Sequence, residues 1–246
     1  MRPFVAVAHG YRAVLDPVER QVIASIVAEV VELLGAALDA AVPAADEEGP
    51  DGLDRDVAGR LARAVAPPSA TVPDDTAVLR LLPDASRDDP EVSEEFRRLT
   101  EGDLRGAKVR RLVAFWRLLQ AGGDSGRLEL PREDASDLAA TLTDIRLVLA
   151  DRLDLRDDER VEALYSELER DQLERDEPER DEPERDELER DDPGRSTDPE
   201  AVEAAQRRRF LGSVYTLLTY LQESLLTAML RDLPRDRPGD QPDVRR

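Results

Sequence analysis

Five basic side chains lie within one acid-free stretch of the sequence, residues 104 to 120: Arg105, Lys108, Arg110, Arg111 and Arg117. Arg110 and Arg117 are seven positions apart, about two turns of a helix, so they fall on one helical face. Cations in this arrangement could contact the phosphates of a nucleic acid. Alternatively, they could pair with surplus carboxylates of the same chain, and Arg207, Arg208 and Arg209 offer the same two alternatives.

Two polar pairs interrupt apolar helical patterns. Asp144 and Arg146 lie in TLTDIRLVLADRL, and Gln222 and Glu223 lie in YLQESLL. A charged residue in an apolar helix is costly unless it is paired. We therefore expect a buried structural pair between Arg146 and Glu223 that fixes the register of two packed helices.

Few residues could support catalysis or metal binding. The chain has no cysteine and one histidine, His9, which lies next to a glycine in a sequence typical of an exposed turn. Thiolate chemistry and a histidine-rich metal site are therefore excluded. Paired acids such as Asp88-Asp89 are typical of helix caps in a chain with 56 acidic residues, and no phosphate-binding glycine motif is present. We expect no enzymatic activity, no metal and no cofactor.

The net charge restricts the class of partner. The chain has 246 residues and a formal net charge of −21. Non-specific DNA binding depends on Lys and Arg contacts with phosphates, so this charge argues against DNA binding over the whole surface. A DNA-related role would need a local basic face or a protein partner that holds the DNA. No apolar stretch reaches the roughly 20 residues of a membrane span, and no signal peptide is evident, so we expect a cytoplasmic protein.

The elements that position these residues are mostly helices. Residues 4–8 and 11–15 flank His9-Gly10 and predict a β-hairpin. Asp16-Pro17 is a typical helix start, and the apolar spacing after it predicts a helix to about Ala41. A loop at 43–53, a short helix at 54–65 and a weak strand at 127–130 are also expected. Further helices are predicted at 75–82, 90–121, 133–153, 157–168 and from 198 to about 231.

The helices at 133–153 and 205–231 are the most apolar, and we expect them to pack together in the core. Between them, residues 169–193 form five acidic pentads, ERDQL, ERDEP, ERDEP, ERDEL and ERDDP, with 14 acids and 5 arginines. Their prolines and charge predict a disordered insert over 169–197. The fold class is therefore mainly α: one helical-bundle domain, residues 1–168 and 198–233, with a small N-terminal β-hairpin and a disordered tail over 234–246.

Three segments of the sequence carry a family resemblance. They are LRLLPDASRDDPEVSEEFRRLTEGDLRGAK at 79–108, LPREDASDLAATLTDIRLVLADRL at 130–153 and YTLLTYLQESLLTAML at 215–230. In this order they resemble an actinobacterial domain-of-unknown-function family that is often encoded beside the adaptor ClpS. The family includes the oxidative-stress transcriptional regulator AosR. That regulator uses a cysteine pair as a redox switch, which this chain cannot do because it has no cysteine.

The resemblance implies a non-enzymatic regulator of transcription without a cysteine switch. It would act through promoter DNA, RNA polymerase or a sigma factor, with the five basic residues of the stretch at 104 to 120 as the candidate contact surface. The alternative is an adaptor linked to ClpS and the Clp proteolytic system. A second copy of the chain is a further candidate partner.

Overall fold

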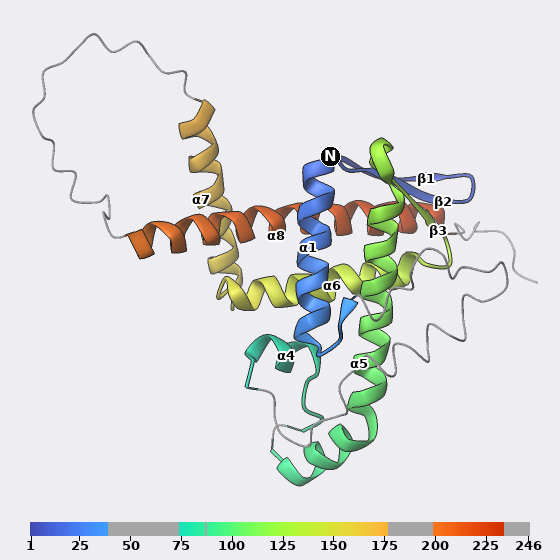
Figure 1. Ribbon diagram of the computed structural model, residues 1–246, viewed down its shortest axis with the longest axis vertical. Helices are drawn as coiled ribbons and strands as arrows, with labels where there is room; N and C mark the ends of the chain where they lie inside the picture. The colour runs from blue at the N-terminus through green and yellow to red at the C-terminus, as the bar shows by residue number, and fades with distance from the viewer. Residues whose placement is uncertain (39–73, 87, 177–198, 234–246) are drawn as a thin grey trace, which may run out of the picture.

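Figure 1 shows the computed structural model, which describes residues 1–38, 74–86, 88–176 and 199–233. Six α-helices, one short 3-10 helix (Gly123–Ser125) and three strands are assigned within these ranges. The predicted loop at 43–53, the short helix at 54–65, most of the pentad insert and the tail from residue 234 lie outside the described residues. The predicted mainly α class with a small β element is confirmed.

The N-terminal hairpin is part of a three-stranded antiparallel sheet. Strand β1 (Arg2–Val7) pairs with β2 (Gly10–Val14), and β2 pairs with β3 (Arg127–Pro131), in the order β1-β2-β3. Gly10 is needed where these strands meet, since a Cβ atom there would lie 2.0 Å from the carbonyl oxygen of Leu130. His9 is an exposed turn residue, as predicted. The third strand gives the hairpin the extra partner that two strands alone lack.

Helix α1 (Pro17–Leu33) begins where the sequence indicates and ends earlier. Asp16 caps it by accepting a hydrogen bond from the backbone N–H of Glu19, whose side chain accepts one in return from the Asp16 N–H. The predicted continuation to Ala41 is wrong. Gly35 adopts a left-handed conformation with φ of 73° just after the helix, a common way for a helix to stop.

Two helices follow on the far side of residues 39–73. Helix α4 (Thr76–Leu81) is capped by Asp75, whose carboxylate accepts from the N–H of Ala77. Helix α5 (Pro90–Ala121) is capped by Asp89 and bends in its N-terminal half (Figure 1). Both starts agree with the sequence, because Asp at the N-cap and Pro in the first turn satisfy the local backbone requirements.

Helices α6 (Ala135–Arg152), α7 (Asp158–Asp176) and α8 (Pro199–Asp232) complete the described elements. Helix α7 continues past the expected end at Leu168 and includes all of the first pentad. That pentad contains good helix formers and no proline, and the described helix ends two residues before Pro178. An ion pair also joins this part of α7 to α8, since Nε of Arg209 lies 2.7 Å from Oδ2 of Asp171.

The buried apolar residues form one hydrophobic cluster to which both the sheet and the helices contribute. Helix α6 packs against α8, as the sequence predicted, and Leu142, Ile145 and Leu218 are fully buried there. Helices α1 and α5 pack on each other and cross the α6–α8 layer (Figure 1). Helix α5 is covered by α1, α6 and β3, and a further side that includes Arg110 and Ala114 is exposed.

A candidate partner-binding groove

The five basic residues predicted as a contact surface lie on α5, and the structure divides them between interior and surface. Lys108 and Arg111 point toward α6 and meet Asp144. Nζ of Lys108 lies 2.5 Å from Oδ1 of Asp144, and Nη2 of Arg111 lies 3.3 Å from Oδ2. The Lys108 side chain is only 11% exposed and that of Asp144 only 8%. Lys108 therefore joins α5 to α6 and is not accessible to a partner.

Arg105 is also engaged inside the molecule. Its Nη1 donates to the carbonyl oxygen of Leu34 at 2.9 Å, and its Nη2 lies 2.6 Å from Oε1 of Glu101. Glu101 is itself buried and pairs with Arg97, with 3.3 Å between Oε2 and Nε. The carbonyl groups at a helix C-terminus carry partial negative charge, so Arg105 stabilises the end of α1. The candidate contact surface is accordingly corrected by removing Arg105 and Lys108.

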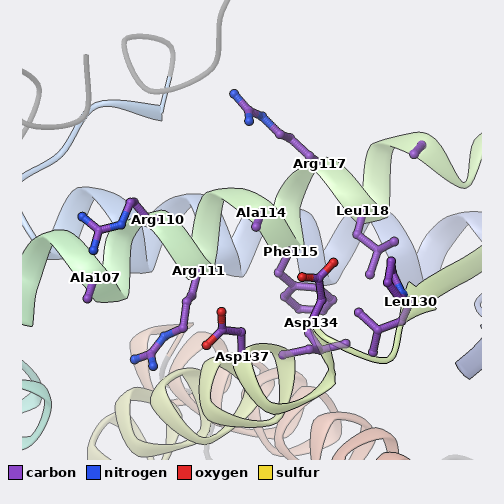
Figure 2. Close-up of a pocket in the computed structure, with 13 residues that line it drawn as sticks. Ala107, Arg110, Arg111, Ala114, Phe115, Arg117, Leu118, Leu130, Asp134 and Asp137 are labelled. Carbon is purple, nitrogen blue, oxygen red and sulfur yellow. The ribbon is translucent and has the colours of Figure 1, made fainter. Parts of the chain in front are cut away.

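Arg110 and Arg117 lie on the outer side of α5. Their seven-residue spacing places both along one edge, and Figure 2 shows Arg117 pointing away from α6 while Arg111 reaches toward it. Arg110 is exposed and forms no ion pair with any side chain in the described ranges. Arg110 is exposed and Arg111 and Arg117 are partly exposed, so these three are the members of the predicted set with surface that a partner could touch.

A groove of about 680 Å³ lies beside these arginines, between α5, the end of β3 and the first turn of α6 (Figure 2). Its floor is apolar and consists of Phe115, Leu118, Leu130 and Leu138. The residues of α5 and β3 that complete the lining are small or basic: Ala107, Ala114, Ala121, Pro131, Arg110, Arg111 and Arg117.

Two carboxylates stand on the opposite wall of the groove. Asp134 and Asp137 lie at the start of α6, and both are exposed. Acids in the first turn of a helix complement its macrodipole, which accounts for their position. The groove thus has a basic wall on α5 and an acidic wall on α6, separated by an apolar floor. Such a surface can bind an amphipathic ligand, and apart from the two carboxylates and the arginines its lining has no polar side chain.

The buried pair predicted for Arg146 forms with a different residue. Nη1 of Arg146 donates to Oε1 of Gln222 at 2.6 Å, and its guanidinium lies over the ring of Tyr215, 5.2 Å from the centroid. Gln222 also donates through Nε2 to Thr143 Oγ1 at 2.7 Å. Glu223 is exposed, because one residue along a helix is a rotation of about 100°. The predicted Arg146–Glu223 pair is therefore corrected to Arg146–Gln222.

The second basic cluster shows the alternative of internal pairing. Arg208 donates through Nη1 to the carbonyl oxygen of Leu153 at 2.9 Å, and its Nε lies 3.4 Å from Oε2 of Glu167. Arg209 pairs with Asp171 on α7. These two arginines join α8 to α7 and to the end of α6. Within the described residues, Arg207 is the member of this cluster that is exposed and has no ion pair.

The acidic wall and the alanines of the groove were not predicted from the sequence. Asp134 and Asp137 are two acids among 56 in the chain, so composition does not single them out. A signal for the alanines does exist, since Ala107, Ala114 and Ala121 repeat every seven residues next to Arg110 and Arg117. Only the position of α6 shows that this repeat borders a groove.

Within the described ranges, no cluster of three metal-ligating side chains occurs, and no helix combines the length and apolarity that crossing a bilayer requires.

Comparison with known proteins places the chain in a family. Comparison with curated proteins and with solved structures finds no significant match. A family model described as "Domain of unknown function (DUF2017)" matches residues 1–229. The match covers nearly all of the chain, which therefore belongs to the DUF2017 family.

Proposed function

We propose that this protein is a non-enzymatic cytoplasmic regulator of transcription, an actinobacterial relative of AosR, that acts by binding RNA polymerase or a sigma factor. The observation that carries the proposal is the groove, in which Arg110 and Arg117 border an apolar floor. Arginine beside exposed apolar surface is typical of protein-binding sites. The absence of cysteine from the sequence means that this regulator would work without a thiol switch.

The groove favours a protein over duplex DNA as the direct ligand. Lys108 and Arg105 are used internally, so the acid-free run presents fewer cations to solvent than its sequence offers. Asp134 and Asp137 face the same groove and would repel phosphates. The net charge of −21 adds to this repulsion. The protein would then act at promoter DNA through the bound polymerase, and would not bind the DNA by itself.

The proposal is tested by measuring binding of the purified protein to RNA polymerase holoenzyme, to its own upstream promoter DNA, and to both together across a salt series. We expect binding to the polymerase with or without DNA, and none to DNA alone at physiological salt. The variant Arg110→Glu should weaken polymerase binding at least about tenfold, because an acidic group of the polymerase would lose the arginine and meet a carboxylate instead.

A matched control is Arg127→Glu, which reverses an exposed arginine on β3 outside the groove. It should change polymerase binding less than about twofold. Salt-sensitive binding to promoter DNA without polymerase would overturn the choice of a protein partner. Binding to ClpS with no binding to polymerase would overturn the transcription proposal in favour of an adaptor linked to Clp proteolysis.

A further inference from the structure

We infer that the N-terminal half of α5 carries a second protein-binding surface, which docks a basic amphipathic helix of a partner protein. The surface consists of Val92, Phe96 and Leu99, and we call it the outer strip. It lies outside the groove, so the inference goes beyond the proposed function and does not depend on what the groove binds. Three features lead to it: the polarity of this half of the helix, the spacing of the strip and the charges around it.

The side of this half that faces the rest of the protein is polar. Ser93, Arg97 and Glu101 are buried there at intervals of four residues, which is about one helical turn. Arg97 forms ion pairs with Glu101 and with Asp84, which lies before the helix. Within the described part of the chain, the buried hydrophobic cluster includes none of residues 83–108. Polar contacts therefore hold this half of α5 against the fold.

The side that faces solvent is apolar. Val92 is 51% exposed, Phe96 46% and Leu99 63%. Single exposed apolar residues are ordinary, but three in a row on a helix whose buried face is polar reverse the usual polarity of a surface helix. An exposed apolar surface of this kind marks a site that another molecule covers.

The C-terminal half of the same helix has the usual polarity. Leu112, Phe115 and Leu119 are buried there, whereas Arg110 and Gln120 are exposed. Figure 1 shows the N-terminal half of α5 extending past α6, where its outer side is open to a partner. The reversal is therefore local to the half of α5 that adds nothing to the hydrophobic cluster.

The spacing of the outer strip selects a helix as the partner. Val92, Phe96 and Leu99 follow one another at intervals of four and three residues, as do the apolar residues along the seam of a coiled coil. A second helix with apolar side chains at the same intervals can pack along this seam. Its other faces remain free for charged residues.

The charges around the outer strip decide the character of that helix. Over residues 88–103, the exposed charged residues are six acids and one base: Asp88, Asp89, Glu91, Glu94, Glu95, Asp103 and Arg98. The base is already paired, because Nη2 of Arg98 lies 2.6 Å from Oε1 of Glu95. Opposite charges across an interface favour docking and like charges oppose it, so the partner helix carries basic residues beside its apolar seam.

A second copy of this chain fits the outer strip less well. Two strips facing each other would bring the exposed acids of both copies together, and like charges across an interface are costly. The net charge of −21 adds to this repulsion. A basic segment of another protein is therefore favoured over self-association.

The test uses a synthetic helical peptide of about 18 residues, with leucines at intervals of three and four residues and lysines beside them. We expect it to bind the full-length protein, measured by fluorescence anisotropy. Leu99→Glu should weaken binding at least about tenfold, because it places a charge in the apolar contact. Leu99 is exposed, so this variant should keep the fold. A peptide with proline in its centre should also bind at least about tenfold more weakly.

The Leu99→Glu variant also separates docking from non-specific attraction. A lysine-rich peptide is drawn to any acidic surface, and the variant makes the protein more acidic, so non-specific attraction would strengthen binding where docking predicts a loss. Leu173→Glu is the matched control, since Leu173 on α7 is 67% exposed. It should not weaken binding by more than about twofold. Equal affinities of the two variants, or tighter binding to Leu99→Glu, overturn the inference.

A second pair of variants tests the charge pattern. Glu95 flanks the outer strip, and Glu94 is rotated away from it by about 100°. Glu95→Lys and Glu94→Lys change the net charge equally, so only a local contact distinguishes them. We expect the first to weaken peptide binding at least about fivefold and the second less than about twofold. Equal effects would overturn the placement of basic residues beside the strip.

Two further measurements identify the occupant and separate this inference from the proposed function. Sedimentation equilibrium that finds a native dimer and a monomeric Leu99→Glu would assign the strip to a second copy and overturn the inference. Arg110→Glu, which tests the groove, should leave peptide binding within about twofold of the native value. Loss of polymerase binding in Arg110→Glu and loss of peptide binding in Leu99→Glu are therefore independent outcomes, and either proposal can fail alone.

Discussion

Lys108 and Arg110 are two residues apart on α5 and lie in opposite environments. Lys108 faces α6 and meets the buried carboxylate of Asp144 at 2.5 Å, whereas Arg110 lies on the open edge of a groove. Two residues along a helix correspond to a rotation of about 200°, which carries one cation inward and the other outward. A run of like charges in a sequence is therefore not one surface until its helix has been placed.

The acids of α6 lie in similarly different environments. Asp144 lies in the middle of that helix, under α5, and serves two cations. Asp134 and Asp137 lie at its exposed start, on the wall of the groove. Asp144 represents a first group, buried carboxylates, which contribute to stability because removing one leaves buried charges without a partner. Asp134 and Asp137 form a second group, exposed carboxylates, which contribute little to stability and are available for recognition.

The largest effect is expected at the buried acid. Asp144→Ala leaves Lys108 and Arg111 without their counter-ion, and we expect the free energy of unfolding to fall by about 3 kcal/mol. Urea denaturation followed by circular dichroism measures this loss. Asp137→Ala removes an exposed acid from the same helix and should cost less than about 0.5 kcal/mol. Equal losses for the two variants would remove the distinction between the two groups.

A smaller effect separates the neighbours Gln222 and Glu223. Gln222→Ala removes hydrogen bonds to Arg146 and Thr143 between α6 and α8, and we expect a loss of about 2 kcal/mol. Glu223→Ala changes an exposed residue and should lie within about 0.5 kcal/mol of the native protein. The same denaturation experiment tests both. A larger loss for Glu223→Ala would restore the pair that the sequence alone suggested.

The smallest of these three losses is expected for the ion pair of Asp75 with Arg152. Its exposure lies between that of the buried and the exposed carboxylates of α6. Asp75 caps α4 and accepts a hydrogen bond from Nη2 of Arg152 on α6 at 2.6 Å. The bond from Arg152 is the main reason that the pKa of Asp75 lies below its ordinary value, with the N–H groups at the start of α4 contributing. We expect Asp75→Ala to cost about 1 kcal/mol at pH 7.

The stability that Asp75→Ala loses should depend on pH, and the lowered pKa of Asp75 sets the direction. A carboxylate whose pKa is lower in the folded state stabilises the fold above the unfolded pKa of about 3.9 and loses that contribution as the pH falls further. The stability gap between the native protein and Asp75→Ala should therefore narrow below about pH 4. Asp74→Ala, at the exposed neighbouring acid, is the control and should show no such gap. A gap that is constant with pH would contradict the assigned role of the Arg152 bond.

Much of the fold follows from local sequence signals. Asp16-Pro17 and Asp89-Pro90 mark helix starts because a side-chain acceptor and a missing N–H suit the first turn of any helix. The end of α1 was harder to predict, because the apolar spacing continues past Leu33 while Gly35 turns the chain. Pairing of β3 with β2 joins residues more than a hundred positions apart, and no local signal encodes that separation.

The candidate site follows the same division. The sequence by itself determined that Arg110 and Arg117 share a helix face, that no cysteine or histidine cluster is available, and that helices α6 and α8 are apolar enough to pack together, since periodicity and composition are local properties. Tertiary structure alone decided which cations are buried in internal ion pairs and which lie at the surface. It did so by placing Asp144 under one face of α5 and leaving Arg110 on an exposed face, because the partner of a charge is set by the packing of helices distant in the chain.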